Sequence, residues 1–460
     1  MKIFIKVIFA SCLISITLFS SCKKYLEVGA PINQVDSKVA FSTEVAALSS
    51  VSGLYNNPNF VAHTGYPEYP LVSAVSYLTG MAADEVYDVY PYYESFRTNT
   101  IPAADNLNNN MWNSAYKEIH FINVAIEGLT ASTGISEASR KQLLGECYTL
   151  RALCFFYLTN MYGDVPLVLT SSVATNATMP RTAQTAVYAQ MVADLTTAQS
   201  LLTDAYPTAL RVRINKTAAT ALLARVYLYQ QNWAAAESQA SSIINNTNYG
   251  LANIDNTFIN TSSETIWQLF TPFGYNIYGR NYIPAGTAIE NVIYVSLETS
   301  FEAGDQRKVK WMKAGTASGI PAYYPFKYKL PASTTAGNEY LVMFRLSEQY
   351  LIRAEARAHQ SKLTGIGSAA EDLLAVRARA GLGNVTATDE PGMLLAIENE
   401  RYHELFTEGH RWFDLKRTGR ATAVLGPKKP GWKSTAVLYP IPAQQRLINK
   451  TLTQNLGYEN

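Results

Sequence analysis

The spacing of small and apolar residues in segment 216–245 predicts two antiparallel helices in close contact. Ala224, Tyr227 and Ala236 recur at the steps of a tetratricopeptide hairpin, in which small side chains let the helix axes approach. Trp233 falls at the expected turn, where its ring would pack between the helices. One such hairpin cannot bury its apolar face alone, so the pattern favours a fold in which several hairpins stack.

Other segments also have the helical period. One stripe places apolar residues at three- and four-residue steps: Leu143, Cys147, Leu150, Cys154, Tyr157 and Met161. A second hairpin is predicted over 346–382, with Ala354 and Ala369 at its close contacts. Single helices are predicted over 42–55 with Ser42 as the N-cap, from Met111 onward, over 185–202 and over 391–406. The chain is therefore expected to be mostly α-helical, with a few short strands.

The start of the chain has the parts of a bacterial lipoprotein signal. Lys2 and Lys6 are followed by an almost continuously apolar run over residues 7–19, and two serines then lead into Cys22. The apolar run is shorter than the ~20 residues that a membrane-spanning helix needs. We therefore predict cleavage before Cys22 and lipidation of its sulfur and amine. The alternatives are an ordinary cleaved secretion signal and an uncleaved membrane anchor.

Two of the four cysteines belong to this signal, and the other two are expected to be core thiols. Cys147 and Cys154 are seven residues apart on one predicted helix. That spacing puts their Cα atoms ~10 Å apart, beyond the reach of a disulfide. No disulfide framework is predicted.

Two long segments, 57–110 and 251–340, have little helical period and are rich in Tyr, Gly and Pro or Asn. Loops of such length are uncommon in a compact body unless they carry function. We expect them to be loop-rich insertions into two helical regions. The predicted organisation is a signal peptide over 1–21, a lipidated tether over 22–40, an N-terminal region over 41–250 and a C-terminal region over 251–460.

Charge argues against nucleic acid as a partner. The chain has 38 basic and 36 acidic residues, a formal net charge of +2, and its basic residues are spread evenly. A protein that neutralises many phosphates carries clustered Lys and Arg instead. With 48% hydrophobic residues, the bulk of the chain is predicted to be ordered around one large core or two fused ones.

Aromatic residues gather in both insertions. Flat rings stack on the apolar C–H faces of sugars, and nearby carboxylates, amides and guanidinium groups bond to sugar hydroxyls, so this composition indicates a carbohydrate-binding surface. The candidate residues are Asp84, Tyr87, Tyr90, Tyr92, Tyr93, Phe96 and Arg97 in the first insertion, and Trp267, Tyr275, Tyr278, Tyr282, Trp311 and Tyr323 in the second. The alternative is that individual rings only fix loops, since Tyr can bury its ring and keep its hydroxyl wet.

Motifs for catalysis and metal binding are weak. Asp84-Glu85 is the nearest carboxylate pair, but the two acids of a glycoside hydrolase lie ~5 to 9 Å apart and normally come from separate strand ends. A solvated pair or an acceptor for sugar hydroxyls is favoured. His403 and His410 lack the His-Glu-x-x-His spacing of zinc peptidases, because Thr407 stands at the required position. No phosphate loop or nucleophile motif occurs, so neither enzymatic activity nor a metal or cofactor is predicted.

A set of short motifs spans the chain in order: Cys22-Lys23-Lys24-Tyr25-Leu26-Glu27, Phe41-Ser42-Thr43-Glu44, Asp84-Glu85, Trp112-Asn113, Tyr162-Gly163-Asp164-Val165-Pro166-Leu167, Arg353-Ala354-Glu355-Ala356, Glu400-Arg401, Glu408-Gly409-His410-Arg411-Trp412-Phe413-Asp414, and Tyr439-Pro440-Ile441-Pro442. Together they resemble the SusD/RagB family of outer-membrane lipoproteins from Bacteroidetes. The ordered set is specific, although no single motif is. Charged residues over 400–417 are expected to form ion pairs along and beyond a helix.

The resemblance implies a right-handed superhelix of tetratricopeptide-like hairpins, with the ligand site in loop-rich regions and with Trp112 and residues 408–417 in the scaffold. It also implies a lipid-anchored binder on the outer face of the outer membrane. Such proteins cap a SusC-type TonB-dependent transporter and capture oligosaccharide, or peptide in some relatives, without catalysis. We therefore predict a hinged lid that hands a glycan to the transporter. The alternatives are a peptide-binding or purely protein-interacting lipoprotein and, least favoured, a glycoside hydrolase using Asp84 and Glu85.

Overall fold

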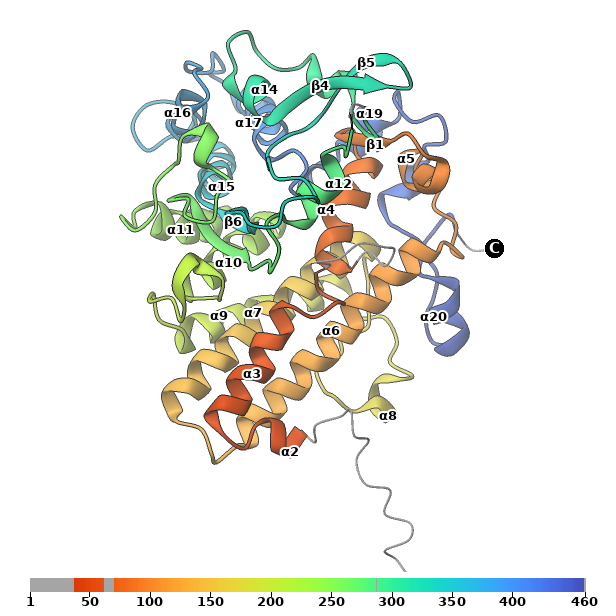
Figure 1. Ribbon diagram of the computed structural model, residues 1–460, viewed down its shortest axis with the longest axis vertical. Coiled ribbons are helices and arrows are strands. Elements are labelled where there is room, and N and C mark those ends of the chain that lie inside the picture. The colour runs from red at the N-terminus through yellow and green to blue at the C-terminus, as the bar shows by residue number, and fades with distance from the viewer. Residues whose placement is uncertain (1–36, 62–69, 287, 459–460) are drawn as a thin grey trace, which may run out of the picture.

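The computed structural model describes residues 37–61, 70–286 and 288–458, so the predicted signal peptide with Cys22 lies outside the described residues. Helices dominate the described chain, as predicted (Figure 1). The N-terminal helices are α2 (Ser37–Ala40), α3 (Glu44–Tyr55), α4 (Leu71–Ala82), α5 (Glu94–Arg97), α6 (Asn106–Ala131), α7 (Glu137–Tyr162), α8 (Val173–Asn176), α9 (Gln184–Leu201), α10 (Lys216–Tyr229) and α11 (Trp233–Ile244).

Shorter helices alternate with strands in the second half. The helices are α12 (Ile277–Tyr282), α13 (Val295–Glu298), α14 (Gln306–Trp311), α15 (Leu346–Ala358), α16 (Ala369–Arg379), α17 (Glu390–Leu405), α18 (Arg411–Arg417), α19 (Ala421–Leu425) and α20 (Ala443–Ile448). The strands of the described chain are β1 (Val86–Asp88), β2 (Thr265–Leu269), β3 (Asn291–Ile293), β4 (Met312–Ala317), β5 (Ile320–Pro325) and β6 (Leu341–Arg345).

The long helix α7 packs against α6 and against α9 in the lower half of Figure 1. The predicted apolar stripe lies on α7, and every residue of it is buried, with Cys147 and Cys154 as free thiols. Gly145 lets the end of α9 approach α7, because a Cβ at Gly145 would lie 2.5 Å from Leu202 Cγ. None of the described helices combines the length and apolar character needed to cross a membrane.

The two predicted hairpins are confirmed. The α10–α11 hairpin buries Ala224 and Ala236 completely, in one cluster with Ala356 of α15. The α15–α16 hairpin buries Ala354 and Ala369 together in a second cluster. Because alanine side chains fill little space, they let neighbouring helices approach where longer side chains would hold them apart.

Capping side chains start helices α3 and α6 at positions that differ from the prediction. Thr43, in place of Ser42, accepts a hydrogen bond from the backbone N–H of Ala46 at the start of α3. Helix α6 begins at Asn106, ahead of the expected Met111, because Asp105 caps it through the N–H of Asn108. A capping side chain satisfies one of the free donors at a helix start, and here these caps set the boundaries.

The first insertion is more ordered than predicted, because it holds α4. All twelve residues of this helix are buried. A helix that is covered on every side has no polar face, so its sequence lacks the period that marks a half-exposed helix. That is why the sequence pattern indicated a loop over 57–110.

The described residues form three separate two-stranded antiparallel sheets, by β1 with β3, β2 with β6, and β4 with β5. The β1–β3 pair joins the first aromatic insertion to the second. Its register places Val86 opposite Ile293 and Asp88 opposite Asn291.

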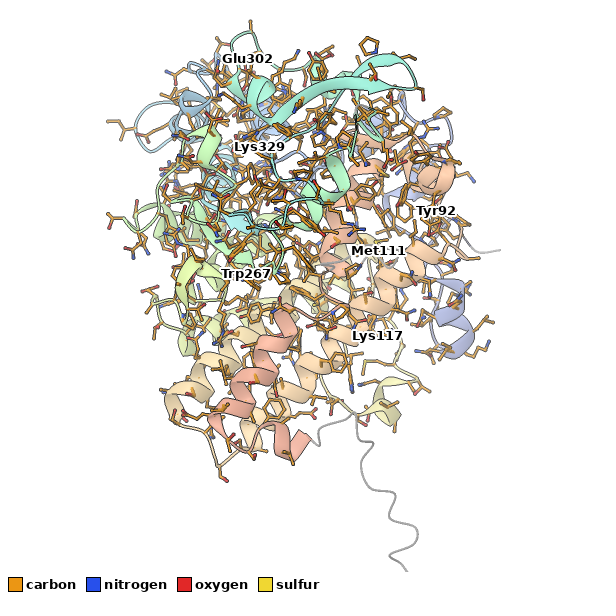
Figure 2. All side chains as sticks on the ribbon, viewed as in Figure 1. Tyr92, Met111, Lys117, Trp267, Glu302 and Lys329 are labelled. Atoms are coloured by element: carbon orange, nitrogen blue, oxygen red, sulfur yellow. The ribbon has the colours of Figure 1, made fainter. Side chains whose placement is uncertain are left out.

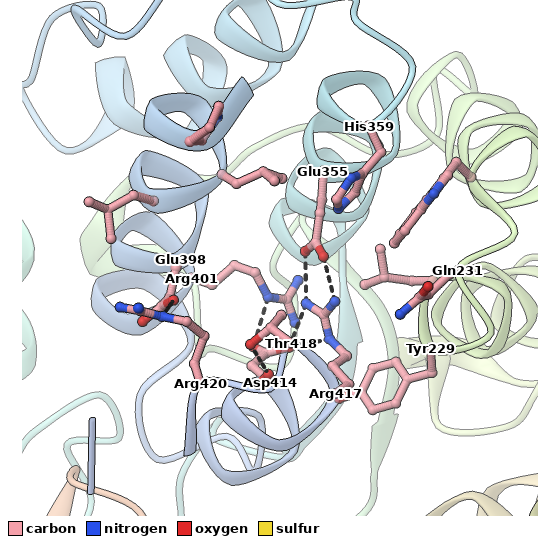
Figure 3. Close-up of a pocket in the computed structure, with 15 residues that line it drawn as sticks. Tyr229, Gln231, Glu355, His359, Glu398, Arg401, Asp414, Arg417, Thr418 and Arg420 are labelled. Atoms are coloured by element: carbon pink, nitrogen blue, oxygen red, sulfur yellow. Dashed lines mark hydrogen bonds and ion pairs between the residues drawn. The ribbon is translucent and has the colours of Figure 1, made fainter. Parts of the chain in front are cut away.

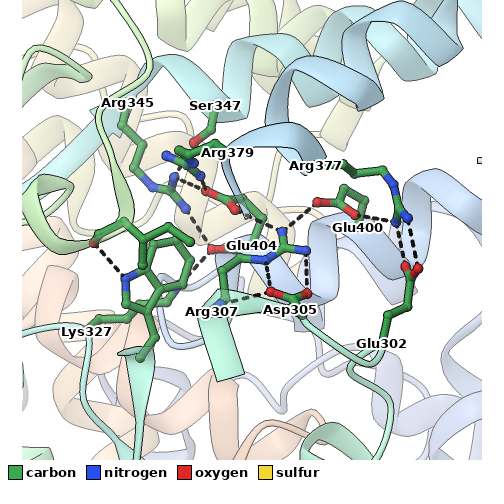
Figure 4. A network of polar contacts seen from close by, with 12 residues as sticks. Glu302, Asp305, Arg307, Lys327, Arg345, Ser347, Arg377, Arg379, Glu400 and Glu404 are labelled. Carbon is green, nitrogen blue, oxygen red and sulfur yellow. Dashed lines mark hydrogen bonds and ion pairs between the residues drawn. The ribbon is translucent and has the colours of Figure 1, made fainter. Parts of the chain in front are cut away.

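A buried network of ion pairs connects α17 with its neighbours (Figure 4). Glu404 accepts hydrogen bonds from Arg345 at 2.5 Å and from Arg307 at 3.0 Å, and Arg379 donates a further one. Glu400 accepts from Arg307 at 2.5 Å. The predicted ion pairs of residues 400–417 are therefore formed, but they connect different elements far more than successive turns of one helix.

His403 of α17 should make stability depend on pH. Its ring stacks on Phe301 with centroids 4.4 Å apart, and its Nε2 lies 2.8 Å from Ser300 Oγ. Burial, followed by the charge of Arg307, lowers the pKa of His403 from 6.5 to about 4. Between these values the unfolded chain binds a proton that the folded chain does not, so stability falls as the pH drops from 6.5 to about 4.

Replacing this ring should flatten the acid side of the stability profile. We expect His403→Gln to remove about 2 kcal/mol of the unfolding free energy that the wild type loses between pH 7 and pH 5. Urea denaturation at the two pH values measures the difference. His120→Gln, at a partly exposed position of α6, is the control. A wild-type pH dependence in His403→Gln would contradict the assignment.

Candidate functional site

Strand β1 brings a tyrosine of the first insertion against one of the second. Tyr87 lies opposite Val292 in the β1–β3 pair. Its ring meets the ring of Tyr294, which follows β3, edge to face with centroids 5.2 Å apart. Segments far apart in the sequence thus contribute to one surface.

Two tyrosine rings stand out from this surface. Tyr90 and Tyr92 are 54% and 55% exposed, and Figure 2 shows Tyr92 at the edge of the molecule. The hydroxyl of Tyr90 lies 3.5 Å from a carboxylate oxygen of Glu290, on the second insertion. Pro91 opens the short 3-10 helix η2 (Pro91–Tyr93), and its fixed φ stiffens the turn that carries both rings.

Arg97 adds a positive charge beside the rings. Its guanidinium, on α5, donates two hydrogen bonds to Glu94 at 2.6 and 2.5 Å, and its side chain stays 39% exposed. Hydrogen bonding to Glu94 raises the pKa of Arg97, and the nearby hydroxyls of Tyr294 and Tyr87 add to this. The guanidinium is therefore a permanent cation next to the tyrosines.

The buried side chain of Lys429 supports this surface from the interior of the protein. Its buried ammonium group donates hydrogen bonds to the carbonyl oxygens of Met81 and Arg97, at 2.7 and 2.8 Å, and to the hydroxyl of Tyr294 at 3.1 Å. These contacts use all three donors of the group. Burial lowers the pKa of Lys429 to about 7. One side chain thus ties the ends of α4 and α5 to the segment after β3.

We call this surface the tyrosine face and define it by Tyr87, Tyr90, Tyr92, Arg97, Glu290 and Tyr294. It offers exposed aromatic rings together with hydroxyl, guanidinium and carboxylate groups. Rings can cover apolar faces of a ligand, while the polar groups exchange hydrogen bonds with its hydroxyls. Tyr323, a further predicted residue, lies half-buried on β5, and β5 packs next to β3.

The two tryptophans of the prediction lie in the core, which corrects their assignment to a ligand site. Trp267 and Trp311 are both fully buried. Trp267 packs between Tyr55 and Phe344, and the indole N–H of Trp311 donates to the carbonyl of Ile254 at 3.2 Å. A ring without exposed surface cannot stack on a sugar.

Five further predicted rings are also buried: Tyr93, Phe96, Tyr275, Tyr278 and Tyr282. Tyr93 and Tyr282 both pack against Tyr77 of α4, with centroids 5.3 and 5.7 Å away. For these positions the alternative stated above holds, since the rings fix loops to the body. The exposed part of the predicted set is limited to Tyr87, Tyr90, Tyr92, Arg97 and Tyr323.

Asp84 and Glu85 are buried as well, so neither a solvated pair nor a ligand contact is formed. The carboxylate of Asp84 pairs with Arg411 at 2.9 Å and with Lys428 at 2.5 Å. Burial would raise the pKa of Asp84, but these two cations outweigh it and lower the pKa. Glu85 is held without exposed surface, and burial followed by the charge of Asp84 raises its pKa to about 8. Both residues are part of the scaffold.

The sequence analysis did not include several residues of the second insertion that are exposed or that contact tyrosines of the first insertion. Tyr294 and Glu290 were absent from the candidate set because the β1–β3 pairing that brings them to Tyr87 and Tyr90 is not local. Phe270 and Phe273 are 42% and 36% exposed, and the signal for them was present in the Pro- and Gly-containing turn after β2.

The two histidines that sequence analysis considered as metal ligands lie on or near α17. His403 and His410 are both buried, the first in the last turn of α17 and the second beyond its end. Among the residues that the structure describes, no three His, Cys, Asp or Glu side chains gather as a candidate metal site.

Two family models match this chain. Residues 24–228 match a model described as "Starch-binding associating with outer membrane". Residues 292–458 match a model described as "SusD family". The two matches together reach from near the start of the chain to its last residues.

Relatives of similar length share about a quarter of their residues with this chain. SusD-like protein P25 from Formosa agariphila is 24% identical over an alignment that covers 76% of this chain and 79% of that protein. SusD-like protein P38 from the same organism is 22% identical over an alignment that covers 97% of each chain.

Solved structures share the fold. A laminarin-binding SusD-like protein matches with a TM-score of 0.74 at 24% identity, covering 91% of this chain and all of the other. The surface glycan-binding protein A from Bacteroides fluxus matches with a TM-score of 0.75 at 21% identity, covering 91% of this chain and all of the other.

Proposed function

We propose, because this chain belongs to the SusD/RagB family, that it binds oligosaccharide or polysaccharide at the tyrosine face. The observation that carries the proposal is the pairing of β1 with β3, which sets the exposed ring of Tyr90 beside Glu290, with the exposed ring of Tyr92 two residues further along the same turn. The relatives described as laminarin-binding and as surface glycan-binding support a sugar as the ligand class.

The chemistry of the face suits a neutral glycan. Tyr90 and Tyr92 would cover C–H faces of sugar rings, and Arg97 and Glu290 would bond to hydroxyl groups. Binding to such an open surface is expected to be weak and partly water-mediated, since a sugar exchanges hydrogen bonds with water for similar bonds with the protein.

Removing the exposed rings should weaken glycan binding. We expect Tyr90→Ala and Tyr92→Ala each to lower affinity about fivefold, because each loses one stacking contact of about 1 kcal/mol. The double variant should be retained about twentyfold less strongly. Affinity gel electrophoresis with a panel that includes laminarin and starch measures the retention.

Phe121→Ala is the matched control, because Phe121 is another exposed aromatic residue, 44% accessible, on α6 away from this face. Its retention should equal that of the wild type. Wild-type retention of the Tyr90/Tyr92 double variant, on a glycan that the wild type binds, would refute the assignment of the tyrosine face.

We further propose binding without catalysis. The hydrolase alternative required Asp84 and Glu85 to reach a substrate, and both are buried in ion-paired or apolar surroundings. The glycan would thus leave the face unchanged.

Delivery of the glycan to a SusC-type TonB-dependent transporter at the outer membrane is the second part of the proposal. It is supported by the family resemblance and by the description "associating with outer membrane" of the matching model. In this mechanism a lipid at Cys22 holds one edge of the chain at the membrane and the tether lets the body move as a lid.

The lipid anchor can be tested directly. Cys22→Ala should release the protein from the membrane fraction, because the thiol that receives the lipid is lost. Fractionation of cells followed by immunoblotting measures the distribution, with Cys12→Ala as the control. A membrane-bound Cys22→Ala protein would exclude lipidation as its anchor.

A further inference from the structure

The carboxylates beside the helical hairpins are balanced by arginines of the same region. A cavity of about 580 Å³ lies between the α10–α11 hairpin, α15, α17 and α18 (Figure 3). In it Arg417 donates to Glu355 at 2.5 and 2.7 Å and to Asp414 at 2.9 Å. Arg420 donates to Glu398 at 3.0 Å. These ion pairs belong to the scaffold, and they compensate the charge of each carboxylate.

Asp88, at the end of strand β1, is a buried carboxylate of a different kind. It is 7% exposed, and no Lys, Arg or His of the described chain pairs with it. Burial raises the pKa of Asp88, and the hydrogen bonds from Tyr90 and Tyr77 offset only part of this effect. The nearby carboxylate of Glu290 raises the pKa further. The negative charge of Asp88 therefore opposes folding, which favours a role in local geometry over a role in overall stability.

Both carboxylate oxygens of Asp88 accept a hydrogen bond. Oδ1 accepts from the backbone N–H of Tyr90, two residues further on, at 2.7 Å. A bond of this kind closes an Asx turn. Oδ2 accepts from the hydroxyl of Tyr77, on α4, at 2.9 Å. Tyr77 thus orients the carboxylate, and the carboxylate fixes the backbone from which the exposed ring of Tyr90 projects.

Tyr77 also supports the second exposed ring. Its ring packs edge to face on that of Tyr93, with centroids 5.3 Å apart and planes at 83°. Tyr93 in turn meets Tyr92 edge to face, with centroids 4.9 Å apart and planes at 82°. Tyr77 is itself buried, in the helix whose twelve residues are all covered. The rings of Tyr90 and Tyr92 therefore both rest on α4, the first through Asp88 and the second through Tyr93.

An open binding surface gains affinity when its rings are held in place before the ligand arrives. Ordering a loop or a side chain on binding costs entropy, so a preformed turn loses less of its interaction energy. Pro91 fixes one φ of this turn, but proline has no N–H with which to attach the turn to the body. The hydrogen bond from Tyr90 to Asp88 supplies that attachment.

We propose that Asp88 is a positioning residue of the tyrosine face, which orders the turn carrying Tyr90 and Tyr92 before a glycan binds. This inference rests on the proposed function of the face. An asparagine would present an oxygen to the N–H of Tyr90 and an amide N–H to the hydroxyl oxygen of Tyr77. The role therefore requires the shape and hydrogen bonds of the side chain, and its charge is dispensable.

The first test measures retention by affinity gel electrophoresis, on laminarin or starch, whichever the wild type binds. Asp88→Ala should weaken retention about tenfold, which lies between the expected losses of one ring and of both rings. Asp88→Asn should stay within about twofold of the wild type. Wild-type retention of Asp88→Ala, or an equal loss in Asp88→Asn, would overturn the proposal.

Asn246→Ala is the matched control. Asn246 forms the same kind of turn, because its Oδ1 accepts from the backbone N–H of Asn248 at 3.0 Å, in the loop after α11. This loop is far along the chain from the tyrosine face, so the variant should retain glycan like the wild type. A loss equal to that of Asp88→Ala would show a general effect of losing such a turn and would contradict a specific role of Asp88.

The double variant Tyr90→Ala/Tyr92→Ala separates this proposal from that of the tyrosine face. In this background Asp88→Ala should change the residual retention less than about twofold, because no exposed ring remains to be positioned. Wild-type retention of the double variant would refute the face itself. Weak retention of the double variant, with a further tenfold loss from Asp88→Ala, would refute only the positioning role.

A measurement without glycan keeps the test decisive if Asp88→Ala does not fold or if the wild type binds neither glycan. Tyr77→Phe keeps the buried ring and removes the hydroxyl that orients Asp88. Amide hydrogen exchange over residues 89–97, followed by mass spectrometry, should be about tenfold faster in Asp88→Ala and about threefold faster in Tyr77→Phe. It should be unchanged in Asp88→Asn. Wild-type exchange in Tyr77→Phe and in any folded Asp88→Ala protein would overturn the proposal.

Discussion

Trp311→Ala is expected to lose about 3 to 5 kcal/mol of unfolding free energy, the range measured for removing a buried tryptophan or phenylalanine ring. The ring is fully buried between Phe258 and Phe406 and donates a hydrogen bond to Ile254. It also covers the ammonium group of Lys327, whose Nζ lies 4.8 Å from the ring centre. The variant therefore leaves a large cavity and an unmatched carbonyl, and it exposes a buried cation. Urea denaturation measures the loss.

Two comparisons separate this structural role from ligand binding. Trp311→Phe keeps most of the apolar volume, so it should retain glycan like the wild type. Tyr92→Ala removes a ring that is 55% exposed and should change the unfolding free energy by less than about 1 kcal/mol while it lowers glycan retention. A stable Trp311→Ala protein with weakened retention would instead return this ring to the ligand site.

Sequence period predicted those helices that have both a buried and a solvent-facing side. The sequence predicted the stripe from Leu143 to Met161 and the alanine contacts at Ala224 and Ala236, because a local 3.6-residue period sets which side chains share a face. Helix α4 could not be predicted from a helical period, because it is buried on every side. Its position depends on contacts with distant segments, such as the hydrogen bond from Ser76 to the carbonyl of Thr407.

The site was predicted by composition but only partly by residue. Tyrosine and tryptophan rings are used both to fill the core and to bind ligands, so a cluster of them in sequence does not tell which rings are exposed. Tyr90 and Trp267 looked alike as candidates, yet one is 54% exposed and the other is fully buried. Which rings are exposed depends on the pairing of β1 with β3, about 200 residues apart, and of β2 with β6, about 75 residues apart. The sequence pattern does not specify either pairing.

Residues 408–417 were expected to be scaffold and the charged residues over 400–417 to form ion pairs, and the partners of this segment explain both. Its carboxylates meet arginines from β6, α14 and α16, and its arginines meet carboxylates from α15 and from the loop before β1. These pairs connect the helical hairpins to both insertions. The segment therefore positions the tyrosine face without contacting a ligand there.

Glu404→Gln should be the most damaging change in this network. Glu404 is fully buried and is shared by Arg345, Arg307 and Arg379. The amide keeps the shape of the side chain but removes the negative charge, which leaves the three guanidinium groups with fewer counter-ions. Removing one partner of a buried ion pair costs about 3 to 5 kcal/mol, because the remaining charge is no longer compensated. We therefore expect a loss of this size in unfolding free energy at pH 7.

The pH dependence of the same variant gives an independent check. Burial would raise the pKa of Glu404, but Arg379, Arg345 and Arg307 outweigh it and hold the pKa well below 4.5. The carboxylate thus stabilises the fold above its unfolded pKa, and this stabilisation is lost as the pH falls below about 4.5 through the folded pKa. Glu404→Gln has already lost this stabilisation at pH 7, so its unfolding free energy should fall less steeply in acid than that of the wild type.

Asp255→Asn is the control, because Asp255 and Lys310 form a half-exposed ion pair that should contribute less than about 1 kcal/mol. Equal losses in Glu404→Gln and Asp255→Asn would show that burial does not strengthen the network, and the account of segment 400–417 as the connection between hairpins and insertions would then be wrong.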